Sequence, residues 1–119
     1  MDREHLLAAL EDAGEAAALC RHALLEGAAL DLHPGSVPTA ALRDIYRSRA
    51  EHLRDHEIAA VGADDAADRL DRTSHASLRI GAVDGGPGGH FFQLFLDPAG
   101  EELVACLAVP VREDDTHDS

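Results

Sequence analysis

The stretch HFFQLFLDPAGEELVACLAVPV, residues 90–111, decides how the second half of this chain folds. Asp97, Pro98 and Gly100 stand at the first, second and fourth positions of a tetrapeptide, as a type I turn favours. The apolar segments on either side, 90–96 and 103–111, have the length and composition of strands. This stretch therefore predicts a β-hairpin.

A third strand precedes the hairpin. From Ser74 onward the pattern has a period of two, in which apolar residues alternate with others: Leu78, Arg79, Ile80, Gly81 and Ala82. The glycine-rich residues 84–89 then form a connection. They do not suit a phosphate-binding loop, because a strand rather than a helix follows and the chain has no lysine. We expect a three-stranded antiparallel meander.

The first 72 residues read as helical. A stripe at helical spacing predicts a first helix over 2–26, capped by Asp2: Leu6, Leu10, Ala13, Ala17, Cys20 and Leu24. Gly14 within it predicts a kink or a close neighbour. A second helix opens at 36–39 and ends at Val61-Gly62, with its own stripe: Leu42, Ile45, Tyr46, Arg49, Leu53, His56 and Ala60. Residues 64–72 add a short third helix.

The fold class that follows is α+β, with the N-terminal helices packed on the C-terminal meander. The length of 119 residues suits one domain. We expect that domain to span 1–111, with a helical half at 1–72 and a β half at 73–111. The polar, acidic residues 112–119 are expected to be a disordered tail.

Both faces of the hairpin are largely apolar, whereas a sheet covered on one side alternates apolar with polar residues. Either helices cover both faces, or they cover one face and another chain, most simply a second copy, covers the other. Two-layer domains are commoner for so few elements, which favours the second explanation and a homodimer. The predicted interface consists of Phe91, Gln93, Phe95, Val104 and Cys106.

The formal charge of −13 arises from 23 acidic and 10 basic residues. Such a field repels nucleic acids and anionic membranes and attracts cationic partners. The N-terminus lacks the basic start and apolar run of a signal peptide, and no segment reaches the ~20 apolar residues of a membrane span. Cys20 and Cys106 read as free core thiols. We therefore expect a cytoplasmic protein.

His52 and His56 are four residues apart, so that both imidazoles lie on one helix face and could bind zinc or another divalent metal. The metalloprotease pattern needs glutamate directly after the first histidine, but Leu53 stands there. The alternative is a solvated helix edge. With Tyr46 and Arg49, which lie on or beside the same face, the two histidines form a predicted ligand-binding patch.

Nothing in the sequence specifies a reaction. Cys20 and His22 point in different directions on a helix, and no serine occupies a nucleophile elbow. We therefore expect a non-enzymatic interaction domain, of the inhibitor, immunity, adaptor or regulatory type, that binds a basic partner protein. The alternative is a ligand- or metal-binding protein that uses the patch on the second helix.

Overall fold

The computed structural model describes residues 2–56, 61–86 and 89–110, and the predicted tail at 112–119 lies outside them. It confirms the α+β class, with four helices and five strands in the described residues. The elements in chain order are α1 (Arg3–Leu10), α2 (Glu15–Leu25), β1 (Leu30–Leu32), β2 (Val37–Pro38), α3 (Thr39–Asp55), α4 (Val61–Arg72), β3 (Ser77–Asp84), β4 (His90–Leu96) and β5 (Leu103–Pro110).

The sheet is antiparallel, in the order β1-β3-β4-β5, with β2 also paired to β3. The predicted β4–β5 hairpin is confirmed: the amide of Gly100 donates to the carbonyl oxygen of Asp97 at 2.9 Å, and the amide of Asp97 donates to the carbonyl oxygen of Glu102 at 3.0 Å. Gly100 has a φ of 73°, which favours glycine. The predicted meander of β3, β4 and β5 is therefore confirmed. The sheet also contains β1 and β2, which come from the half of the chain that was expected to be helical.

The predicted single helix over 2–26 is wrong, because it is divided into α1 and α2. The division falls at Gly14, the position where a kink was expected, which caps α2 with a φ of 109°. A residue in that conformation cannot continue a helix. At the start of α1, Oδ1 of Asp2 accepts a hydrogen bond of 2.8 Å from the amide of His5, as the capping prediction requires.

The second and third helices differ from prediction at their ends. Residues Val37 and Pro38 belong to β2, so that α3 begins at Thr39. Val61-Gly62, the expected end of the second helix, is instead the start of α4. The short third helix is therefore real and longer than the predicted 64–72.

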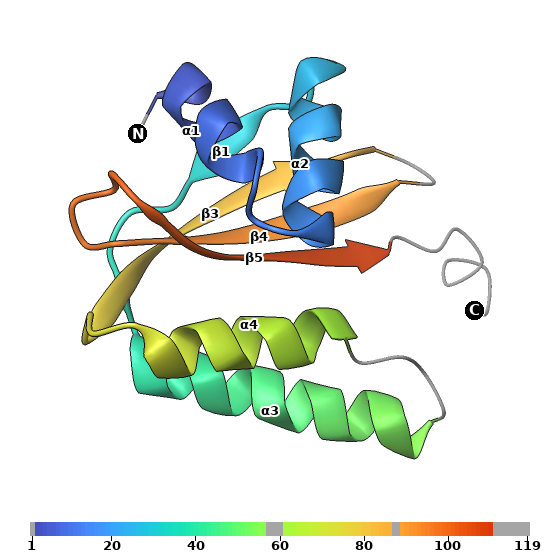
Figure 1. The fold of residues 1–119 in the computed structure, drawn as a ribbon, viewed down its shortest axis with the longest axis vertical. Coiled ribbons are helices and arrows are strands. Elements are labelled where there is room, and N and C mark those ends of the chain that lie inside the picture. Colours follow the sequence, from blue (N-terminus) through green and yellow to red (C-terminus); the bar gives the residue numbers. More distant parts are fainter. Residues whose placement is uncertain (1, 57–60, 87–88, 111–119) are drawn as a thin grey trace.

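The helices form two layers with the sheet between them: α1 and α2 lie on one face, α3 and α4 on the other (Figure 1). The expectation of an open sheet face is therefore wrong, since splitting the first helical segment supplies a second pair of helices. On the α1–α2 side the largest buried side chains include Phe92 and Leu94. On the α3–α4 side they include Tyr46 and Phe95. Each apolar face of the hairpin is covered by the chain itself.

Small residues let α4 lie close to the sheet. Among the side chains of α4 that the structure describes, the buried ones are three alanines and one leucine: Ala63, Ala66, Ala67 and Leu70. At Gly62 a Cβ atom would lie 3.1 Å from Cδ1 of Leu107 on β5. A larger side chain at Gly62 would therefore require the side chain of Leu107 to shift or α4 to move away from β5.

Candidate functional site

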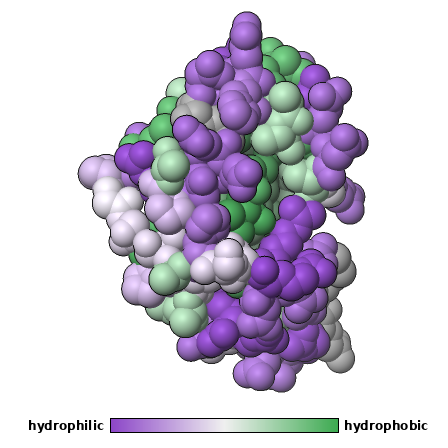
Figure 2. Space-filling model, turned by 60° about the vertical axis from the view of Figure 1, so that its left-hand side comes forward, coloured by the Kyte–Doolittle hydropathy of each residue, from purple (hydrophilic) through white to green (hydrophobic). Residues whose placement is uncertain are grey.

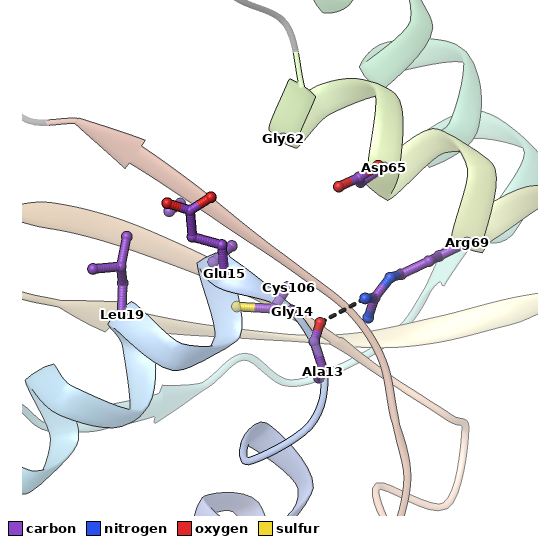
Figure 3. A pocket seen from close by; sticks show the side chains of 10 residues that line it. Ala13, Gly14, Glu15, Leu19, Gly62, Asp65, Arg69 and Cys106 are labelled. Atoms are coloured by element: carbon purple, nitrogen blue, oxygen red, sulfur yellow. Dashed lines mark hydrogen bonds between the residues drawn. The ribbon is translucent and has the colours of Figure 1, made fainter.

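A hollow of about 180 Å³ lies beside β5, between α2 and α4 (Figure 3). β5 is the outer strand of the β1-β3-β4-β5 row, and α2 and α4 cover opposite faces of the sheet. Side chains from both helical layers therefore meet here: Glu15 and Leu19 from α2, Asp65 and Arg69 from α4, and Cys106 from β5. We call this the β5 hollow.

Arg69 closes one side of the β5 hollow. Its Nη2 donates a hydrogen bond of 2.5 Å to the carbonyl oxygen of Ala13, in the connection between α1 and α2. A Cβ atom on Gly14 would lie 3.2 Å from the same nitrogen, so glycine gives the guanidinium its room. The half-buried Arg69 is thus engaged with the protein itself and joins the two helical layers.

The open side of the hollow is acidic. Glu15 and Asp65 are both exposed, and Figure 3 shows their carboxylates on either side of the space. Glu15 lies in the first turn of α2, where the helix dipole favours a negative charge. Leu19, one turn further along α2, is 40% exposed and adds an apolar wall. The hollow therefore combines an apolar surface with two carboxylates.

The thiol of Cys106 lines the hollow but is a poor nucleophile. A hydrogen bond with the thiol of Cys20, followed by burial, raises the pKa of Cys106 well above its ordinary value. A thiol with a raised pKa stays protonated at neutral pH, whereas the thiolate is the reactive form. Both cysteines are free, as expected. The two thiols lie together in the core between the sheet and the α1–α2 layer.

Three of the four arginines of α3 are paired with acidic residues of α4. Arg43 and Arg47 both reach Asp71, and Arg54 binds Asp64 at 2.9 Å. These pairs are exposed and stabilise the fold only slightly. Figure 2 shows hydrophilic side chains over the lower part of the molecule, where α3 and α4 lie. The pairing cancels positive against negative charge locally and leaves the net charge of the chain at −13.

The predicted ligand-binding patch is divided by the structure. Tyr46 is only 3% exposed, and its hydroxyl donates a hydrogen bond of 2.7 Å to Oε1 of Gln93. Its ring also packs edge-to-face on Phe95, with centroids 5.6 Å apart. Burial raises the pKa of Tyr46 well above its ordinary value. Tyr46 thus belongs to the core, while Arg49 is exposed on the surface of α3.

The predicted metal-binding pair is brought together. The rings of His52 and His56 have centroids 4.4 Å apart, and both side chains are exposed. Nδ1 of His56 lies 2.9 Å from the carbonyl oxygen of His52, within hydrogen-bond distance. This contact occupies one nitrogen of His56. Metal binding by the pair stays a prediction.

The five residues predicted as an interface do not share one open face. Phe95 is 1% exposed and Gln93 is bonded to Tyr46, both beneath the α3–α4 layer. Val104 packs on the α3–α4 side of the sheet, whereas Cys106 packs on the α1–α2 side. The two side chains differ because a register shift next to Phe95 leaves Val104 without a partner on β4. Only Phe91 among the five is exposed, at 37%. Self-association of the chain stays a prediction.

Comparison with models of known protein families finds no match, and comparisons with curated proteins and with solved structures find none either. Within the described residues, every helix is too short or too polar to cross a membrane. The assignment of a function therefore depends on the geometry of the chain itself.

Proposed function

We propose that this protein is a non-enzymatic interaction domain that binds a cationic segment of a partner protein at the β5 hollow. The observation that carries the proposal is the meeting of Glu15 and Asp65, from helices on opposite faces of the sheet, beside one apolar wall. The proposal keeps the class expected from the sequence and moves its site from the sheet face to the strand edge.

A lysine or arginine side chain of the partner suits this hollow. Such side chains combine an apolar stem with a charged head. The stem would lie along Leu19, and the head would lie between the carboxylates of Glu15 and Asp65. Arginine gains most from such a position, because its guanidinium can bind carboxylates through two parallel hydrogen bonds. Arg69 also carries a positive charge beside the hollow. Its hydrogen bond to the carbonyl oxygen of Ala13 holds this guanidinium against the protein.

The charge of the whole chain supports the same partner. A net charge of −13 steers cationic segments toward the molecule and raises their association rate at low salt. No histidine is among the described residues that line the hollow, so the protonated thiol of Cys106 has no imidazole base beside it. This chemistry favours recognition over catalysis. Both cysteines are free thiols, and the cytoplasm keeps thiols reduced. We therefore propose that the protein is cytoplasmic.

The test is to map the binding of a short oligo-arginine peptide by amide chemical shifts of isotope-labelled protein. We expect the largest shifts at 13–19, 62–69 and 106–108, the segments that contribute to the hollow. We also expect the affinity to fall steeply with salt. Shifts centred on α1, or on the outer surface of α3, would overturn the assignment of the site.

A further inference from the structure

We infer that His75, Asp97 and Glu102 form a binding site for a divalent transition-metal ion such as zinc. His75 lies in the connection between α4 and β3, and the two acidic residues lie in the β4–β5 turn. One ligand atom from each side chain lies within 4.8 Å of those of the others. Ligands that bind one zinc ion at about 2.0–2.2 Å in a tetrahedral site lie roughly 3.4 Å from each other, so small rotations of these side chains would bring the three ligand atoms onto one ion.

The imidazole of His75 stands on a connection that is fixed to α3. The hydroxyl of Thr39 donates a hydrogen bond of 2.6 Å to the carbonyl oxygen of His75. The amide of Thr39 donates to the carbonyl oxygen of Ala76 at 2.9 Å. Thr39 is buried, which protects both bonds from water. The backbone of His75 is therefore held in place before any ion binds.

The carboxylate of Asp97 is held in place as well. Its Oδ1 accepts hydrogen bonds from the amides of Glu101 at 2.6 Å and Glu102 at 3.0 Å. Both bonds use Oδ1, and Oδ2 takes part in neither. An aspartate carboxylate is ionised at neutral pH, and these two bonds fix the orientation of this one. An oriented, ionised carboxylate can bind a metal without first losing a proton.

The donor set selects the kind of ion. One imidazole nitrogen and two carboxylate oxygens suit zinc and other divalent transition metals better than calcium or magnesium, which prefer oxygen ligands alone. Three protein ligands leave at least one position to water. Arg79 lies near the turn, since a Cβ atom on Gly100 would come 3.2 Å from its Nη1. The site must therefore bind its ion against one neighbouring positive charge.

Calorimetric titration of chelator-treated protein with zinc chloride tests the inference. We expect saturable binding of one ion, weakened at least about tenfold in His75→Ala and in Glu102→Gln. Glu101→Gln is the matched control, because Glu101 is an exposed carboxylate of the same turn outside the cluster. It should bind zinc as the parent does. Glu102 is also exposed, so Glu102→Gln tests the site if His75→Ala fails to fold.

A second arm separates this site from the histidine pair on α3. The double variant His52→Ala, His56→Ala should keep the zinc affinity of the parent. If that variant loses zinc while Glu102→Gln retains it, the ion binds on α3 and the inference is overturned. Equal affinity in the parent, His75→Ala and Glu102→Gln would overturn it as well, and so would a parent that binds no zinc.

Discussion

Nη2 of Arg69 donates a hydrogen bond of 2.5 Å to the carbonyl oxygen of Ala13, and this bond joins helical layers that lie on opposite faces of the sheet. It passes beside β5, the outer strand of its row (Figure 3). An outer strand with free backbone groups can pair with other chains, and proteins commonly cover such edges. Arg69 therefore covers part of the β5 edge and forms one wall of the β5 hollow.

Replacing Arg69 by alanine should lower the free energy of unfolding by about 1.5–3 kcal/mol, the range for a hydrogen bond to a charged group. Urea denaturation measures the change. Arg72→Ala is the control, since Arg72 is exposed on the same helix, and it should stay within about 0.5 kcal/mol of the parent. Equal losses in the two variants would show that the bond to Ala13 does not join the layers.

Gly14→Ala and Gly27→Ala form a second matched pair. The two glycines have nearly the same φ, 109° and 108°. A Cβ atom on Gly14 would lie 3.2 Å from Arg69, whereas one on Gly27 would meet nothing within 4 Å. Each change should lower the free energy of unfolding by about 1–3 kcal/mol through backbone strain, and Gly14→Ala by more. In an Arg69→Ala background that difference should disappear, which thermal unfolding can measure.

Tyr46→Phe should lower the free energy of unfolding by about 1–3 kcal/mol, because it leaves Oε1 of Gln93 without its hydrogen-bond donor in a part-buried position. Adding Gln93→Leu should recover much of that loss, since both polar partners are then gone. A double variant as unstable as the sum of the two single variants would contradict this coupling.

The same hydroxyl predicts how stability depends on pH. In the unfolded chain tyrosine has a pKa of about 10, whereas burial raises the pKa of Tyr46 in the fold. The contribution of Tyr46 to the free energy of unfolding is fully present below pH ~10. It is lost as the pH rises above that value, because the tyrosine hydroxyl of the unfolded chain then releases its proton first. Tyr46 is the single tyrosine and there is no tryptophan, so phenolate absorbance reports this residue alone. Phenolate absorbance should rise together with unfolding, and ionisation of the intact fold near pH ~10 would contradict the prediction.

The elements that the sequence predicted well are those that depend on local chemistry. The turn at 97–100 is specified by its own residues, and the strands beside it follow from composition. β1 and β2 were not predicted because they are only three and two residues long. They form strands because each pairs with β3. At Gly14 the sequence indicates an interruption. The sequence does not show whether the helix bends there or ends, and the φ of 109° at Gly14 ends it.

The candidate sites could not be predicted for a related reason. Glu15 and Asp65 are 50 positions apart and meet only because two helical layers enclose the same strand. The sequence drew attention to Tyr46 and to Gln93 separately, as parts of a ligand patch and of an interface. Their hydrogen bond shows that they are partners of each other. Polarity alone does not reveal whether a side chain is available to a ligand or already has its partner within the protein.

We propose that Glu15 and Asp65, rather than the total charge, recognise a cationic segment. Two variants that each remove two negative charges test it: Glu15→Gln with Asp65→Asn, and Glu4→Gln with Asp68→Asn. The second is a matched control, since Glu4 lies in the first turn of α1 as Glu15 does in α2, and Asp68 is exposed on α4 as Asp65 is.

The decisive measurement is the affinity of the two variants for the oligo-arginine peptide, by calorimetry at one salt concentration. We predict a loss of about tenfold or more, equivalent to roughly 1.4 kcal/mol, in Glu15→Gln with Asp65→Asn. Its matched control should bind nearly as the parent does. Equal losses in the two variants would show that the peptide responds only to net charge, and would contradict the β5 hollow as the binding site.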